Sequence, residues 1–330
     1  MNSKVAVVTG GSAGVGRATV RELAAAGYNV AVLARGQDGA EAAAKEVENA
    51  GRRGLAVPID VTDLDALRAA AERVERELGP IDLWVNVAFV GALAYFWDTS
   101  PDEYRRITDV TYFGQVNGVR VALERMRPRD AGVIVNVGSA LAFRGIPLQS
   151  AYCGAKHAIK GFTESVITEL RSEQSRVRLC MVELPGMNTP QFTWNLNKMP
   201  GHPKPVPPIY QPELAARAVA FLARHPRRNM WVGIPTAYTI LGNRIAPAFL
   251  DWYLGRTGVK GQLTQQPLPR FPSNVFEPVA GDHGAHGPFD AHARSPMLWA
   301  SMHRALVTGA AVAAATAATL RRFRVSRTGR

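Results

Sequence analysis

The feature that most constrains the fold of this chain is a regular alternation, over residues 1–235, of short apolar runs with longer helical patterns. The runs predicted to be strands are residues 4–9, 29–34, 54–60, 82–87, 132–137, 177–182 and 229–233. Runs of Val, Ile and Leu are typical of strands buried on both faces, and alternation with helices indicates parallel pairing. The sequence therefore predicts an α/β fold with a doubly wound, mostly parallel, seven-stranded sheet, and with ligands beyond the carboxyl ends of its strands.

Residues 236–330 lie outside this alternation and are predicted to be a C-terminal extension of a single domain, residues 1–235. The extension has a helical pattern at residues 246–255, a stretch interrupted by prolines, and an alanine-rich segment with a basic tail. Within the domain, the prolines of residues 198–212 disfavour helix and sheet, so about residues 187–212 are predicted to form a substrate loop. A static surface connection is the alternative interpretation of that loop.

Cysteine content and charge distribution limit the possible partners. Cys153 and Cys180 are too few for a disulfide framework or a zinc site, and no secretory signal is recognisable, so we expect a cytoplasmic protein. Residues 291–330 contain seven arginines and no acid, which leaves only +5 of the net charge of +12 for residues 1–290. Because no nucleic-acid-reading motif accompanies the basic residues, we expect no nucleic-acid binding.

A glycine-rich segment, VVTGGSAGVGRATV, joins the first predicted strand to the first predicted helix. Gly10, Gly14 and Gly16 allow a tight turn and a close approach to a diphosphate, which would lie at the amino end of that helix. Because the glycines stand between a strand and a helix, the segment predicts a Rossmann-type dinucleotide site.

Four motifs in order resemble those of the short-chain dehydrogenase/reductase family, over about residues 4–235. They are the glycine-rich turn, Asp60 after the third strand, Ser139 thirteen residues before Tyr152, and a proline-glycine turn that ends in Thr189. By this resemblance, Asp60 contacts the adenine and Thr189 the nicotinamide amide. The predicted cofactor contacts are Thr9, Gly10, Ser12, Gly14, Val15, Gly16, Arg17, Arg35, Asp60, Val61, Asn86, Ala88, Tyr152, Lys156, Pro185, Gly186 and Thr189, and no metal is expected.

Tyr152 and Lys156 are four residues apart in a predicted helix, so their side chains share one face. A nearby ammonium stabilises a phenolate, whereas the pair alone also fits an ordinary amphipathic helix. The resemblance implies that Tyr152 is the general acid or base, that Lys156 lowers its pKa and holds the nicotinamide ribose, and that Ser139 hydrogen-bonds the substrate oxygen. The expected reaction is hydride transfer between the nicotinamide cofactor and a ketone or secondary alcohol.

The chain departs from the family pattern at two places. Val87 and Phe89 replace an asparagine and a glycine after the fourth strand, which alters the adenosine wall. Thr111 replaces a catalytic asparagine whose main-chain carbonyl holds a relay water in the family, and a threonine keeps that carbonyl. A serine hydrolase with Ser139 as nucleophile is disfavoured by the missing G-x-S-x-G motif, and an inactive cofactor-binding relative is the remaining alternative.

The end of the second strand predicts NADP(H) as the cofactor. NAD-dependent enzymes place an acid there for the ribose hydroxyls, whereas this chain has Ala34 and then Arg35, with Arg17 just past the last motif glycine. Arginine pairs well with a 2′-phosphate, and a solvated Arg35 is the alternative.

The predicted substrate is a bulky lipophilic ketone or alcohol, because apolar and aromatic side chains follow the strands around the site. These side chains are Phe89, Tyr95, Phe96, Trp97, Phe143, Met187, Phe192 and Trp194, although half of them would be core in the alternative interpretation. The family resemblance suggests a homodimer or homotetramer formed through the helices around Thr111 and Tyr152.

The extension holds two further candidate sites. His and Asp residues within 282–292 could bind a metal, but their glycine-rich context favours an ordered loop without one. The uncharged run 305–320 lies between Arg304 and Arg321 and is too short and alanine-rich to span a bilayer. We hypothesise that it holds the protein peripherally on anionic membranes, the alternative being a helix that packs on the core or frays in solvent.

Overall fold

The computed structural model describes residues 3–307 and contains a sheet in which every neighbouring pair of strands is parallel. The strands lie in the order β10-β7-β6-β4-β1-β2-β3. Their bounds are β1 (Val5–Thr9), β2 (Asn29–Ala34), β3 (Gly54–Pro58), β4 (Ile81–Asn86), β6 (Val133–Val137), β7 (Arg178–Glu183) and β10 (Asn229–Trp231). Each strand predicted from an apolar run is present, so the predicted seven-stranded, doubly wound sheet is confirmed.

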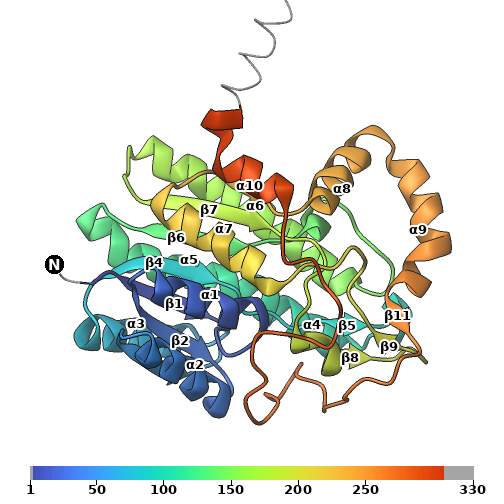
Figure 1. The fold of residues 1–330 in the computed structure, drawn as a ribbon, viewed down its shortest axis with the longest axis horizontal. Helices are drawn as coiled ribbons and strands as arrows, with labels where there is room; N and C mark the ends of the chain where they lie inside the picture. Colours follow the sequence, from blue (N-terminus) through green and yellow to red (C-terminus); the bar gives the residue numbers. More distant parts are fainter. Residues whose placement is uncertain (1–2, 308–330) are drawn as a thin grey trace, which may run out of the picture.

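Helices cover both faces of this sheet (Figure 1). Within residues 3–307 they are α1 (Gly14–Ala25), α2 (Gln37–Asn49), α3 (Leu64–Glu77), α4 (Pro101–Thr108), α5 (Gly114–Met126), α6 (Ser150–Ser172), α7 (Pro212–Arg224), α8 (Ile234–Ile245), α9 (Pro247–Gly261) and α10 (Pro296–Met302). α1, α2 and α7 share a buried cluster with Ala6 and Val8 of β1, whereas α3, α5 and α6 share a second cluster with Val5 and Val7. Neighbours along β1 thus alternate between two apolar layers, which explains the uninterrupted apolar run.

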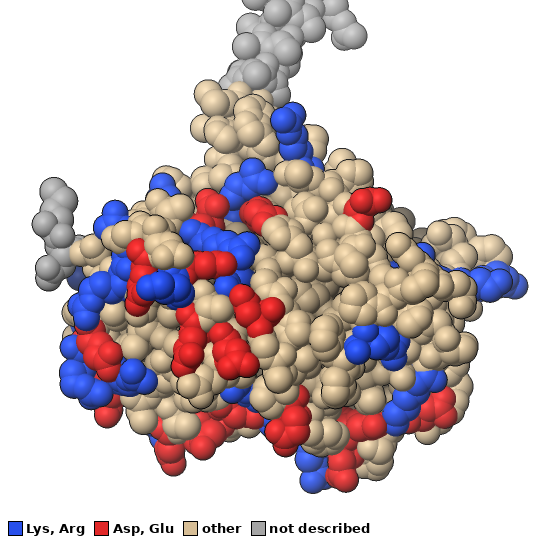
Figure 2. Space-filling model, turned by 60° about the horizontal axis from the view of Figure 1, so that its bottom comes forward, with Lys and Arg blue, Asp and Glu red and all other residues tan. Residues whose placement is uncertain are grey.

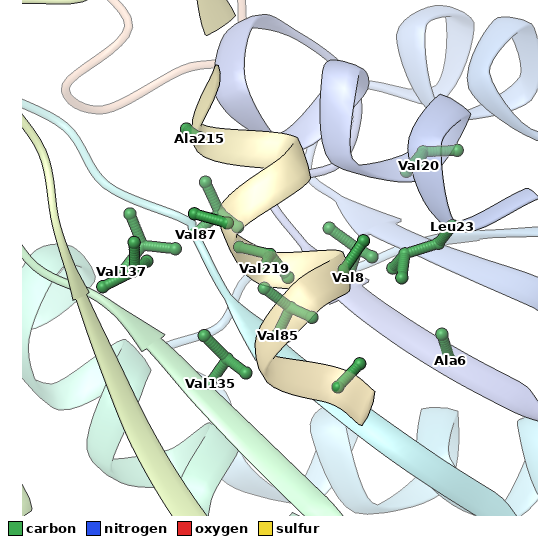
Figure 3. Close-up of a cluster of buried hydrophobic side chains, with 14 of the residues drawn as sticks. Ala6, Val8, Val20, Leu23, Val85, Val87, Val135, Val137, Ala215 and Val219 are labelled. Carbon is green, nitrogen blue, oxygen red and sulfur yellow. The ribbon is translucent and has the colours of Figure 1, made fainter. Parts of the chain in front are cut away.

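The layer beneath α7 is closed by small side chains, as Figure 3 shows. Val219 of α7 faces Val85 of β4 and Val135 of β6, and Ala215 lies one turn away on the same helix. Such short side chains let the helix lie close to the strands at the density of a protein interior. The sheet below the site is therefore a firm support for side chains at its carboxyl edge.

The strand order reverses between β1 and β4, because the chain builds β2 and β3 on one side of β1 and β4, β6, β7 and β10 on the other. Thr9 joins the two strands at this point. Its hydroxyl donates to the Val85 carbonyl (3.4 Å) and accepts the Val87 N–H (3.2 Å). A reversal of this kind is where open α/β sheets bind their ligands.

Two details of the C-terminal third differ from the sequence prediction. The pattern at residues 246–255 predicts one helix, whereas the chain forms α8 as well as α9. α8 begins at Ile234 after the N-cap Gly233 (φ +78°) and has Pro235 in its first turn, which are start signals that the sequence analysis missed. The proline-rich loop was expected to stay out of sheets, yet β9 (His202–Pro203) pairs antiparallel with β11 (Leu263–Thr264). A ladder this short tolerates a proline at its edge. A second short pair joins β5 (Ala92–Leu93) to β8 (Leu196–Asn197).

A long segment without regular structure follows β11. Figure 1 shows it leaving β11, passing the ends of α1 and α2, and returning to α10. On the surface seen in Figure 2, acidic and basic side chains of the described residues are interspersed and form no continuous basic patch. Among residues 3–307 no helix is long and apolar enough to cross a membrane. Most of the run 305–320, for which membrane contact is hypothesised, lies outside the described residues.

Candidate active site

Ser139, Tyr152 and Lys156 are brought together by two elements of the fold. Ser139 follows β6 as the N-cap of a short 3₁₀ helix, where its hydroxyl accepts the Leu141 N–H (3.1 Å). Tyr152 and Lys156 lie one turn apart in α6. All three line a cavity of about 650 Å³ at the carboxyl edge of the sheet. The three residues that sequence motifs gave as catalytic candidates are therefore neighbours in space.

A strand carbonyl holds Lys156 close to Tyr152. The ammonium donates to the Val137 carbonyl at the end of β6 (2.7 Å) and lies 5.5 Å from the centre of the Tyr152 ring. Phe89, which stands where the family has glycine, packs edge-on against Tyr152 with 5.7 Å between ring centres and adds to the burial of the pair. Lys156 is only 2% exposed, and burial lowers the pKa of its ammonium to about 8.

The surroundings of Tyr152 shift the pKa of its phenol upward, whereas the sequence analysis expects a shift downward. Burial raises the pKa of Tyr152, and a hydrogen bond with the Ser139 side chain opposes that shift only in part. The expected lowering of this pKa by Lys156 is not among the contributions to the shift, and the Lys156 ammonium donates to the Val137 carbonyl. In this state the tyrosine is a protonated acid.

A buried carboxyl that the sequence analysis missed lies behind the cavity. Glu183, the last residue of β7, is 0% exposed, and its Oε2 is so close to Gly138 that a Cβ there would come within 2.2 Å of it. Burial raises the pKa of this carboxyl to about 8, and the charge of Lys156 opposes the shift. The sequence signal that could have revealed it is a glutamate at the end of an apolar strand. Burying a charge is costly, so a charged residue next to a predicted buried strand deserved a separate hypothesis.

The turn between β1 and α1 has the geometry that a dinucleotide requires. Gly10 and Gly14 adopt φ of +68° and +56°, and a Cβ at Gly16 would lie 2.0 Å from the Gly10 carbonyl oxygen. α1 has neither a side-chain cap nor an acidic residue in its first turn. The Gly284 carbonyl accepts the Gly14 N–H (3.0 Å), and the rest of the positive end remains available for an anionic diphosphate.

Thr189 provides a second test of the fit to a cofactor. The residue is 4% exposed, and its hydroxyl has no hydrogen-bond partner among the described residues. A buried hydroxyl left unpaired costs about 1–3 kcal/mol, so a polar ligand group at this point would stabilise the site. Gly14 is so near that a Cβ there would lie 3.2 Å from the Thr189 Cβ, which places this hydroxyl next to the glycine turn. The residues present fit a nicotinamide dinucleotide.

Arg35 and Asp60 line the other end of the cavity, where other groups engage their charged atoms. The Arg35 guanidinium donates to the Phe276 carbonyl (2.7 Å) and to the Asn274 carbonyl, both in the extension. Asp60 accepts a hydrogen bond from Arg106. Burial and, secondarily, the charge of Arg106 lower the pKa of Arg35. This end of the cavity is therefore built partly from residues far away in sequence.

Most of the predicted site residues line the cavity. These are Gly10, Ser12, Gly14, Val15, Gly16, Arg35, Asp60, Val61, Ala88, Ser139, Tyr152, Lys156, Pro185, Gly186 and Thr189. Four predicted site residues, Thr9, Arg17, Asn86 and Thr111, do not line it.

Arg17 and Asn86 lie outside the cavity because protein groups already bind their polar atoms. Arg17, 1% exposed, pairs with Glu46 (2.8 Å) and Asp282 (3.1 Å). Asn86, 0% exposed, donates to the Asn136 side-chain oxygen (2.9 Å) inside the sheet. Both residues stabilise the walls of the site and do not face the cavity.

Thr111 lies in a π-helical turn, Asp109–Phe113, between α4 and α5. Its hydroxyl donates to the Val90 carbonyl (3.0 Å) and accepts the Val90 N–H (3.3 Å). The side chain thus holds the segment that follows β4 and is 0% exposed. Inserted π turns often occur at functional sites, and a relay through the Thr111 main-chain carbonyl stays a prediction.

About half of the predicted substrate-pocket side chains line the cavity, namely Phe89, Met187, Phe192 and Trp194. Phe96 and Trp97, by contrast, are 64% and 76% exposed. The sequence analysis missed the lining residues from α8 and α9, which are Pro235, Tyr238, Thr239, Leu250, Tyr253 and Leu254. It also missed those from the extension, which are Asn274, Pro278, Val279, Gly281 and His283.

The His and Asp residues of the extension serve other contacts. His286 pairs with Glu213 (2.7 Å), and the His283 ring lies edge-on against Trp194. In the part of the chain that the structure describes, no group of three or more His, Cys, Asp or Glu side chains is placed to hold a metal ion.

Comparison with known proteins adds an independent line of evidence. The family model for short chain dehydrogenase matches residues 4–200. The curated uncharacterized oxidoreductase YxnA of Bacillus subtilis (strain 168) is 30% identical over 288 residues, which are 86% of this chain and 80% of that protein.

Two solved structures share the fold. A short chain dehydrogenase from Mycobacterium paratuberculosis bound to NAD matches with a TM-score of 0.61 at 24% identity, over 69% of this chain and 95% of that one. A metagenomic short-chain oxidoreductase in complex with NADP matches with a TM-score of 0.57 at 27% identity, over the same shares of the two chains. One of these proteins holds NAD and the other NADP, so the comparisons do not decide between the two cofactors.

Proposed function

This chain belongs to the short-chain dehydrogenase family of oxidoreductases, and on that premise we propose that it transfers a hydride between NADP(H) and a lipophilic ketone or secondary alcohol. The observation that carries the proposal is the convergence of Ser139, Tyr152 and Lys156 on one cavity. The glycine turn and the unpartnered Thr189 hydroxyl of the same cavity support the cofactor.

In this mechanism the chain supplies a proton and holds the reacting oxygen. The bound cofactor supplies or accepts the hydride. In reduction, the Tyr152 phenol donates its proton to the substrate oxygen, and the Ser139 hydroxyl donates a hydrogen bond to the same atom as negative charge develops. The raised pKa of Tyr152 keeps the phenol protonated until it is needed. Lys156, fixed by the Val137 carbonyl, would hold the nicotinamide ribose.

The choice of NADP(H) over NAD(H) rests on Arg35. This residue lines the cavity just past β2, where no acidic side chain is present to bind ribose hydroxyls. Its guanidinium has five N–H donors, and three of them reach carbonyls of residues 274–276, which leaves two for a 2′-phosphate. Arg17, the second candidate, does not contribute to this proposal, because Glu46 and Asp282 engage it.

A lipophilic substrate is supported by the lining of the cavity near Tyr152. Phe89, Phe192 and Trp194 come from the domain, and Tyr238 and Tyr253 come from α8 and α9. A pocket with aromatic walls and few convergent polar groups suits a bulky apolar carbonyl compound better than a sugar or a charged acid.

The test is a panel of lipophilic ketones and secondary alcohols in which NADPH oxidation or NADP reduction is followed by absorbance. We expect turnover with at least one class and a loss of turnover in Tyr152→Phe. Tight NADPH binding without turnover on any class would favour the rival interpretation, a catalytically inactive cofactor-binding relative.

We also propose that the protein is cytoplasmic and contacts anionic membranes. The contact surface would be the apolar face of α8 and α9, made by Ile234, Tyr238, Leu241, Ile245, Phe249, Trp252 and Tyr253, each at least 47% exposed. An apolar patch this large on a water-facing surface indicates an interaction site. Arg244, Arg256 and Lys260 are exposed on the same helices and could meet anionic headgroups, whereas Asp251 is paired with Arg144. Tyr238 and Tyr253 also line the cavity, so a lipophilic substrate could enter here.

Sedimentation with anionic vesicles separates this face from the basic tail. We expect full-length protein to sediment at low salt and the double variant Phe249→Ser, Trp252→Ser to stay in the supernatant. Phe96→Ser is the matched control, because Phe96 is equally exposed but lies elsewhere, in the short helix before α4. If the double variant still sediments, the contact lies in residues 308–330; if the wild type does not sediment, the membrane proposal is wrong.

We further propose a homodimer or homotetramer through α5 and α6. The support is Phe113 at the start of α5, which is 48% exposed and packs beside Tyr112, whose ring in turn contacts Phe162 of α6. Light scattering should give an oligomer for the wild type and a smaller species for Phe113→Ser.

A further inference from the structure

The extension crosses the cofactor cleft between two buried anchors. Val275 is 1% exposed and packs in the apolar cluster that contains Val61, next to the end of β3. Ala285 is also 1% exposed and packs against Ala18 of α1. Between these anchors lie residues 276–284, which we call the strap. Its first residues are exposed to solvent, whereas both anchors are as buried as the core of the sheet.

Polar contacts fasten the strap to both walls of the cleft. They are Arg35 to the Phe276 carbonyl (2.7 Å), the Gly281 N–H to the Asp38 carboxylate (3.0 Å), Arg17 to Asp282 (3.1 Å), and the Gly14 N–H to the Gly284 carbonyl (3.0 Å). The partners on the domain side belong to the glycine turn, the first turns of α1 and α2, and the end of β2. These are the elements that surround the adenosine and diphosphate end of the site.

The inner side of the strap is part of the cavity wall. Pro278, Val279, Gly281 and His283 line the same cavity as the glycine turn and Arg35. The strap therefore lies over the cavity and touches the glycine turn at Gly14, and a ligand on the rest of that turn would be enclosed between the two.

We propose that the strap is the outer wall of the dinucleotide cleft: it contacts the adenosine and diphosphate part of the cofactor and lifts when the cofactor enters or leaves. This inference rests on the proposed function. Because the anchors are buried and the span between them is held by a few polar contacts, the span can open without disturbing the core. Gly281 and Gly284 adopt φ of +90° and +61°, a conformation that lets the strap bend toward the cleft.

Amide hydrogen exchange of the full-length protein, with and without NADPH, tests the contact directly. We expect NADPH to slow exchange in peptides that cover residues 276–284 and in the glycine turn together. Slower exchange in the glycine turn with unchanged or faster exchange in the strap would overturn the inference, because the cofactor would then bypass or displace the strap. If NADPH changed neither region, the proposed function would fail first, and this inference with it.

The dissociation rate of NADPH tests the lifting step. Val275→Ala loosens the first anchor without changing any charge, and we expect NADPH to leave about tenfold faster, equivalent to ~1.4 kcal/mol. Val121→Ala in α5 is the matched control, because Val121 is equally buried but belongs to the cluster on the other face of the sheet. Equal dissociation rates in Val275→Ala and the wild type, or an equal acceleration in both variants, would contradict a strap that holds the cofactor.

Discussion

The two ends of the cavity are built in different ways. At the catalytic end, a loop and a helix place Ser139, Tyr152 and Lys156, and the spacing along α6 brings two of them together. At the adenosine end, Arg35 is held by the Phe276 carbonyl, 241 residues away in sequence, and Arg17 by Asp282. Local spacing therefore specifies the chemistry, whereas closure of the cofactor cleft depends on contacts between distant parts of the chain.

Removal of the phenol at the catalytic end should have the largest effect on turnover. Tyr152→Phe deletes the proton donor together with its hydrogen bond to Ser139, so we expect turnover to fall by about 10²- to 10⁴-fold while NADPH binding is kept. Steady-state kinetics and a fluorescence titration measure the two properties separately. Tyr28→Phe, a buried tyrosine between α1 and β2, is the control. Retained turnover in Tyr152→Phe would mean that the pair on α6 is only a helix face.

The adenosine end should respond through cofactor preference. Arg35→Asp removes a charge-assisted contact, and we expect NADPH affinity to fall at least about tenfold while NADH affinity changes less, because such a contact is worth about 1.5–3 kcal/mol. The exposed Arg52→Asp makes the same charge change away from the site. An equal loss for both cofactors in Arg35→Asp would show that Arg35 only holds the strap and does not select the 2′-phosphate.

The buried carboxyl behind the catalytic end should appear in the pH dependence of stability. The pKa of Glu183 is raised to about 8 in the folded state, so the folded protein binds more protons than the unfolded chain between the ordinary carboxyl pKa and pH 8. This group therefore lowers stability progressively as pH rises through that window. Glu183→Gln should match the wild type near pH 4 and melt several degrees higher near pH 8.

Melting curves across this pH range measure the difference, and Glu164 provides a control of opposite sign. Burial raises the pKa of Glu164, but the hydrogen bonds and charges of Lys160 and Arg228 together lower it below the ordinary value. Glu164→Gln should therefore not gain stability relative to the wild type as pH rises. A constant offset between Glu183→Gln and the wild type at every pH would contradict a raised pKa for Glu183.

The smallest effect on activity is expected at Thr111, whose hydroxyl serves the backbone of Val90. Thr111→Val removes both hydrogen bonds and keeps the shape, so stability should fall by about 1–2 kcal/mol. Turnover of the folded variant should change less than about threefold, since the proposed relay uses the main-chain carbonyl. A collapse of turnover with circular dichroism unchanged would give the hydroxyl a catalytic task of its own.

The sequence predicted the sheet and the catalytic end because both depend on local patterns. Each strand contains a short apolar run, and Tyr152 and Lys156 follow from the helical repeat together with the motif order. It failed at Arg17, which lies beside the glycine turn in sequence but pairs with Glu46 and Asp282 in space. No sequence spacing predicts that contact.

Two other features could not be predicted from the sequence, for physical reasons. The pKa of Tyr152 depends on burial by its whole surroundings, Phe89 included, and a helical spacing to one lysine does not measure that burial. The strap contains no helix or strand, so neither of the periodic patterns on which the prediction relied is present in it. Its anchors, Val275 and Ala285, lie in a stretch of mixed polar and apolar residues that has no regular hydrophobic spacing.

A crystal structure of the full-length protein with NADPH tests the central claim most directly, since it places the cofactor against both ends of the cavity at once. The account predicts the nicotinamide at the end lined by Thr189, Ser139 and Tyr152, and the adenosine end beneath residues 276–284 with Arg35 beside the 2′-phosphate. A cofactor bound with the strap displaced from the cleft, or a nicotinamide remote from Tyr152, would contradict it.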